Sequence, residues 1–89
     1  RLMGQISPSD EGRFFTVEGV VTEMESQKWL KAWLRDHTGE ILIFMPERVV
    51  PYLPKGVGVG TRLRVTGEVD IYNSVVEIVP LAGADIEVR

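Results

Sequence analysis

The sequence predicts an all-β domain, a closed five-stranded Greek-key barrel with one short helix between the third and fourth strands. Five segments alternate apolar and polar side chains with the period of two that is typical of strands. Turns that contain glycine, proline or aspartate separate these segments, and only residues 46–53 can form a helix. A small open sandwich is the competing architecture for the same order of elements.

The chain begins with residues 1–12, which show no regular period and are expected to form a linker or a loosely held N-terminal arm. Residues 13–89 are expected to form the domain. The first strand is predicted to start at Phe14, and one of its sides carries Phe15, Val17, Gly19 and Val21. Glycine inside a strand indicates a bend or a close backbone approach, as occurs at barrel corners.

The segment WLKAWLRDHTGEILIFM, residues 29–45, predicts a hairpin. Its turn, Asp36-His37-Thr38-Gly39, has aspartate at the first position and glycine at the last, which favours a type I turn. Six apolar side chains are expected to point inward: Leu30, Ala32, Leu34, Ile41, Ile43 and Met45. This hairpin therefore supplies the second and third strands.

The second half of the chain supplies the helix and the remaining strands. Pro51 limits the helix at residues 46–53 to about two turns, because proline has no backbone N–H to donate. Strands are predicted over residues 62–69 and 75–79, and the tail could add a short edge strand. Arg62 and Arg64 are expected to pair across the sheet with Glu18.

Alternation leaves an unusual outward face on the hairpin. If the six apolar residues point inward, the opposite face carries Trp29, Lys31, Trp33, Leu42 and Phe44. The solvent side of an antiparallel sheet is normally polar. Large apolar patches of this kind mark contacts with ligands or other proteins, so this face is the candidate binding surface.

Composition limits the classes of function. The chain has 89 residues, enough for one domain, and its net charge is −3. It has no cysteine and one histidine, so a disulfide framework, a thiolate metal site and a histidine metal cluster are excluded and no cofactor is expected. No segment is long and apolar enough for a membrane span or a signal peptide, which favours a cytoplasmic protein without a membrane partner. Because the chain starts at Arg1, it is expected to be part of a longer protein.

No group of residues has the pattern of a catalytic site. His37 lies in a turn without a second histidine, a cysteine or a serine placed to form a catalytic arrangement. The segment GVGVG, residues 56–60, matches no phosphate-binding motif and precedes a strand rather than a helix. We therefore expect the domain not to be an enzyme.

Three segments together resemble a known family. They are VEGVV (residues 17–21), LKAWLRDHTGEILIFM (residues 30–45) and GTRLRVTGEVDIYNSVVEI (residues 60–78). They are similar to the strands of OB-fold nucleic-acid-binding domains, such as the anticodon-binding domains of class II aminoacyl-tRNA synthetases and the OB domains of replication proteins.

The resemblance implies a binding module for single-stranded DNA or RNA with little sequence preference. Its site would be the outward face of the hairpin together with the loop between the fourth and fifth strands: Trp29, Lys31, Trp33, Leu42, Phe44 and Tyr72. The acidic balance of the chain keeps open an alternative, because phosphate-binding proteins usually carry a basic excess. In that alternative the aromatic face docks a neighbouring domain of the same chain, another protein or a second copy.

Overall fold

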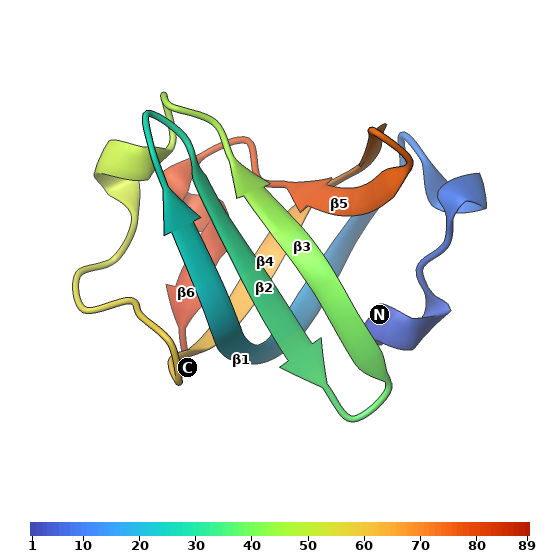
Figure 1. The fold of residues 1–89 in the computed structure, drawn as a ribbon, viewed down its shortest axis with the longest axis horizontal. Coiled ribbons are helices and arrows are strands. Elements are labelled where there is room, and N and C mark those ends of the chain that lie inside the picture. Colours follow the sequence, from blue (N-terminus) through green and yellow to red (C-terminus); the bar gives the residue numbers. More distant parts are fainter.

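The computed structural model describes residues 1–89 and shows five strands that close into a ring (Figure 1). The strands are β1 (Phe14–Ser26), β2 (Leu30–Asp36), β3 (Gly39–Met45), β4 (Arg62–Tyr72) and β5 (Val75–Val79), and a short β6 (Ile86–Val88) follows. The ring runs β1-β2-β3-β5-β4 and closes because β4 also pairs with β1. The predicted five-stranded barrel is confirmed.

The long strand β1 closes the barrel because it takes part in two pairings. Its first half pairs with β4, its second half pairs with β2, and Val20 lies in both registers. Gly19 lies at this corner, where an added Cβ would be 2.5 Å from the carbonyl oxygen of Arg35. The close backbone approach predicted at this glycine is therefore present.

The β2–β3 hairpin has the predicted register and turn position. Asp36 pairs with Gly39 across a turn made by His37 and Thr38. All six side chains expected to point inward are buried and belong to one core cluster of 15 residues. Strands β4 and β5 add four buried side chains to this cluster: Leu63, Val65, Val69 and Ile78.

The helical segment is shorter than predicted. Residues 46–53 contain only a 3-10 turn, η3 (Val50–Tyr52), which lies on the connection between β3 and β4. Pro51 within it lacks an N–H, and the next proline, Pro54, prevents continuation into an α-helix. The structure contains no helix of the length and hydrophobicity needed to cross a membrane.

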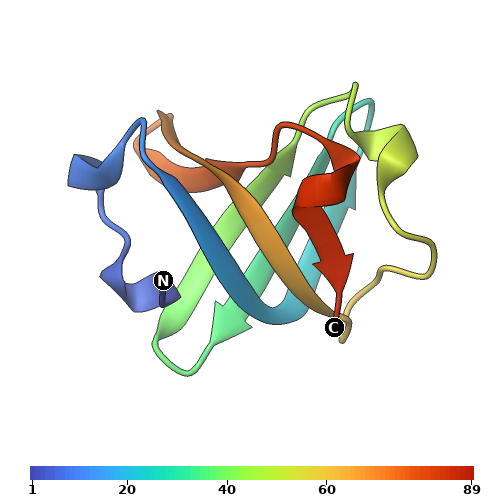
Figure 2. The ribbon, with the colours of Figure 1, turned by 180° about the vertical axis from the view of Figure 1, so that it is seen from behind.

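Strand β4 also extends further than predicted. It continues to Tyr72, and the turn to β5 is made by Asn73 and Ser74 alone. Both turn residues have positive φ, 51° and 65°, which is typical of the type I′ turns that match the twist of a hairpin. The predicted edge strand is present as β6, which pairs with β4 beyond the end of β5, and Figure 2 shows it at the edge of the barrel.

The N-terminal arm is packed against the barrel, a contact that its irregular sequence did not indicate. Its two 3-10 turns are η1 (Met3–Gln5) and η2 (Pro8–Asp10). Met3 is only 3% exposed and belongs to the core cluster. The Met3 N–H donates to Asp36 Oδ2 at 2.9 Å, and the Gly4 N–H donates to Thr38 Oγ1 at 2.9 Å. The β2–β3 turn therefore holds the arm over one end of the barrel.

Asp36 is expected to make the fold sensitive to acid. Burial acts to raise the pKa of this carboxyl, but hydrogen bonds from Met3, Thr38 and Gly39 outweigh burial and lower the pKa to about 2. A lowered folded-state pKa stabilises the fold above the unfolded pKa, and the stability is lost as pH falls from about 4 through 2. Water screens this partly exposed group, so we expect a loss of about 1 kcal/mol.

Urea unfolding of the wild type and of Asp36→Asn at several pH values between 2 and 7 measures this effect. The difference in stability between the two proteins should shrink as pH falls, because protonation removes the advantage of the carboxylate. A difference that stays constant from pH 7 to pH 2 would show that the charge of Asp36 is not involved.

Candidate nucleic-acid interface

Two aromatic side chains meet on the outward face of the hairpin. The ring centroids of Trp29 and Phe44 are 6.0 Å apart, and the planes are tilted by 45°. The Lys31 Nζ lies 4.9 Å from the centroid of the Trp29 ring, close enough for a cation–π interaction. Lys31 is also the register partner of Phe44. The alternation of the hairpin thus brings two flat apolar rings and one positive charge together.

These residues form one wall of a groove of about 480 Å³. We call it the aromatic groove, and its lining residues are Trp29, Lys31, Phe44, Asp70, Tyr72, Glu77 and Val79. Strands β4 and β5 supply the other lining residues. Tyr72 stands at the end of β4 with 62% of its surface exposed. The groove thus has aromatic side chains from the hairpin and from β4.

The structure separates the six site residues predicted from the sequence. It brings together four of them in the aromatic groove: Trp29, Lys31, Phe44 and Tyr72. Trp33 is partly exposed but does not line the groove. Leu42 is only 7% exposed, because its register neighbours Trp33 on β2 and Glu77 on β5 flank it. The expectation that Leu42 offers an open contact surface is therefore wrong, because its side chain is buried between these two neighbours.

Sequence reasoning missed the two carboxylates of the groove. Asp70 and Glu77 are register partners on β4 and β5. Alternation could have indicated both residues. Asp70 is two residues before Tyr72 and therefore shares its face of β4, and Glu77 lies between the inward Val76 and Ile78 and therefore points outward from β5. The pairing of β3 with β5, which is parallel, places Glu77 beside Leu42 and so beside the aromatic face.

Glu77 is an unusual residue for a surface groove. It is only 4% exposed, and its register partner on β4 is a second carboxylate, Asp70. Burial raises the pKa of Glu77 to about 6, the negative charge of Asp70 acts in the same direction, and the charge of Lys31 opposes both. Because its pKa is raised in the folded state, Glu77 stabilises the fold at pH values below its unfolded pKa. This stability is lost as the pH rises through about 6.

The chain is similar to known proteins in sequence and in fold. A family model described as an OB-fold nucleic acid binding domain matches residues 15–82. The chain belongs to this family. No curated protein sequence matches the chain significantly.

Solved structures share the fold of this OB domain at low sequence identity. Asparaginyl-tRNA synthetase from Pyrococcus horikoshii aligns with a TM-score of 0.78 and 20% identity, over 99% of this chain and 22% of the synthetase chain. The chain thus spans less than a quarter of the length of that enzyme.

Two further structures illustrate the range of proteins with this fold. A replication protein A heterotrimer bound to single-stranded DNA aligns with a TM-score of 0.64 and 17% identity, over 78% of this chain and 52% of the other. An OBody bound to hen egg-white lysozyme aligns with a TM-score of 0.78 and 15% identity, over 100% of this chain and 91% of the other. Identities this low establish the fold alone.

Proposed function

We propose that this OB domain binds single-stranded DNA or RNA with little sequence preference, as a binding module within a larger protein. The observation that carries the proposal is the aromatic groove, which Trp29, Phe44 and Tyr72 line together with the charge of Lys31. Any unpaired base can stack on an aromatic side chain, because every base has a flat π face. Lys31 is placed to meet a phosphate between stacked bases.

Tryptophan fluorescence tests the proposal directly. Trp29 lines the groove, so adding a single-stranded oligonucleotide at low salt should quench its emission, and added salt should reverse the quenching. A duplex of the same length should bind more weakly, because its bases are already stacked and paired. Absence of quenching at high micromolar oligonucleotide and low salt would refute the proposal for this domain.

Glu77 should make the binding depend on pH. A bound phosphate disfavours the ionised carboxylate, so affinity is expected to rise as pH falls from 7 through about 6. Glu77→Gln removes the charge at every pH and should strengthen binding at pH 7.5 by about fivefold, equivalent to about 1 kcal/mol. Fluorescence titrations at pH 5 to 8 would measure both effects. If the pH profile of Glu77→Gln equals that of the wild type, another group controls it.

The carboxylates of the groove support a second candidate function. Asp70 and Glu77 repel phosphates, and they suit a positively charged segment of a protein better than a polyanion. In this case the aromatic groove docks a neighbouring domain or a second copy. Sedimentation at increasing concentration distinguishes self-association from the nucleic-acid function. A protein that remains monomeric and is quenched by oligonucleotide would contradict docking of a second copy.

A further inference from the structure

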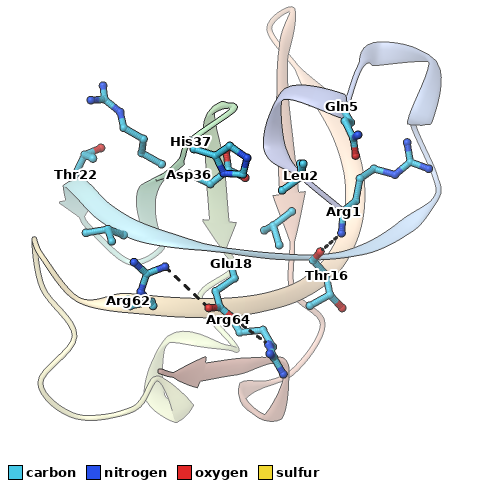
Figure 3. Close-up of a pocket in the computed structure, with 13 residues that line it drawn as sticks. Arg1, Leu2, Gln5, Thr16, Glu18, Thr22, Asp36, His37, Arg62 and Arg64 are labelled. Carbon is cyan, nitrogen blue, oxygen red and sulfur yellow. Dashed lines mark hydrogen bonds and ion pairs between the residues drawn. The ribbon is translucent and has the colours of Figure 1, made fainter.

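A second groove lies between the N-terminal arm and the outward faces of β1 and β4. It has a volume of about 960 Å³, and four arginines line it: Arg1, Arg35, Arg62 and Arg64. In Figure 3, Arg62 and Arg64 lie around Glu18 and Arg1 lies on the arm, while Asp36 and His37 come from the end of β2 and the turn that follows. We call this hollow the arginine groove. Strands β1 and β4, which carry it, are seen in front in Figure 2.

The arginine groove is positive although the chain as a whole is acidic. Four of the ten lysines and arginines line it, against two carboxylates, while the net charge of the chain is −3. One of these carboxylates, Asp36, is already occupied by hydrogen bonds to the arm and the turn. The other, Glu18, lies 3.2 Å from Arg64 and 4.0 Å from Arg62, and 3.9 Å from Arg89, which is closer to Glu87 at 3.6 Å. Within the groove one carboxylate is thus shared by Arg62 and Arg64 and does not neutralise both guanidinium groups.

Most of the hydrogen-bonding capacity of these arginines is unused within the protein. The only guanidinium hydrogen bond among the four runs from Arg64 Nε to Glu18 Oε1 at 3.2 Å. Arg62 Nη1 is 4.0 Å from Glu18, and Arg35 Nη2 is 3.8 Å from Glu40, both too long for a hydrogen bond. Each guanidinium carries five N–H donors in a planar fork that fits phosphate oxygens. The partly exposed side chains can turn to a ligand at little cost, since surface ion pairs are weak.

The arginine groove continues the outward face of β2. Alternation along β2 places Lys31, Trp33 and Arg35 on that face after Trp29. Arg35 pairs with Val20 of β1, which also lines the arginine groove. At about 3.3 Å per residue, Arg35 lies about 20 Å along the strand from Trp29. A single path thus leads from the aromatic groove past Trp33 to the arginines.

We propose that the arginine groove binds the phosphodiester backbone of the same single strand whose bases stack in the aromatic groove. The inference rests on the proposed function and adds a second, purely electrostatic part to the site. Arg62 and Arg64 contact phosphates there and read no base. The domain then covers a longer strand than the aromatic groove alone accommodates, within the range of about 4 to 16 nucleotides seen for one OB fold.

Two oligonucleotide lengths and a charge-matched control test this inference. Fluorescence anisotropy with labelled strands of about 4 and about 12 thymidines measures affinity as a function of salt for three proteins. The test variant carries Arg62→Gln and Arg64→Gln, whose side chains are about half exposed in the wild type, at 52% and 42%. The control carries Arg48→Gln and Lys55→Gln. These substitutions change the net charge by the same amount, and neither Arg48 nor Lys55 lines either groove. Thermal melts confirm that each variant is folded.

The expected result is a selective loss. The test variant should bind the long strand about tenfold more weakly than the control does, and its salt slope should fall by about 1.4, or 0.7 for each lost phosphate contact. Both variants should bind the short strand equally. A longer strand also offers more positions at which the protein can bind, and this raises its affinity for every variant. The test is therefore the difference between the two variants on the long strand, and not the difference between the two strand lengths.

Two other outcomes would overturn the inference, and they differ in what they imply. If the short strand binds but both variants bind the long strand alike, the arginine groove does not contact nucleic acid while the proposed function stands. If the wild type binds neither strand, the proposed function fails and the inference fails with it.

Discussion

Replacement of Trp29 by alanine is expected to weaken the binding of a single-stranded oligonucleotide by about 5- to 150-fold. The loss corresponds to about 1–3 kcal/mol, the contribution of one base stacked on an aromatic ring. Trp29 is placed for such a stack because Phe44 packs against it at 6.0 Å and Lys31 lies over its ring at 4.9 Å. Anisotropy of a labelled oligonucleotide measures the change, since the variant loses part of its own tryptophan signal.

The control for this prediction is Tyr52→Ala. Tyr52 is also an exposed aromatic residue, at 71%, but it lies on the 3-10 turn η3 and does not line the aromatic groove. Its removal should leave the affinity unchanged. Equal losses in the two variants would mean that the oligonucleotide adheres to exposed aromatic residues in general and that the groove has no special role.

Replacement of Met3 by alanine is expected to lower the free energy of unfolding by about 2 to 5 kcal/mol. Large-to-small substitutions in a packed core lose the transfer free energy of the removed atoms and leave a cavity. Met3 qualifies because it is 3% exposed and its Cε lies near Gly19, where an added Cβ would be 2.7 Å from it. Urea denaturation measures the change, and a loss of this size would make the N-terminal arm part of the domain.

Leu2→Ala is the matched control for the arm. Leu2 is the adjacent apolar residue in the chain but is 38% exposed, so its truncation should change the free energy of unfolding by less than about 1 kcal/mol. If Met3→Ala is as mild as Leu2→Ala, the arm does not contribute to the core in solution.

Alternation was enough to predict most of the fold. The six inward residues of the hairpin and the pairing of Arg62 and Arg64 with Glu18 follow from a period of two, and both are confirmed. The close backbone approach at Gly19, expected from a glycine inside a strand, is confirmed too. The helix between β3 and β4 was overestimated, because the two prolines leave room for only one 3-10 turn. The packing of Met3 had no sequence signal, because an irregular arm has no period from which burial could be inferred.

The candidate site was predicted less completely than the fold. The sequence indicated Trp29, Lys31 and Phe44, which lie together because they share one face of one hairpin. It did not indicate that Leu42 is covered or that Glu77 is buried beside it. Both facts depend on the parallel pairing of β3 with β5, which joins segments more than 30 residues apart.

The sequence by itself determined which side of each strand faces the core, because alternation is a local property of an extended chain. It thereby determined that aromatic residues remain on the outward face. Only the tertiary structure decided which outward residues meet. Closure of the ring brings the carboxylates of β4 and β5 to the aromatic hairpin, and it brings the arginines of β4 to β1. These contacts arise between distant segments, so their geometry depends on the whole barrel.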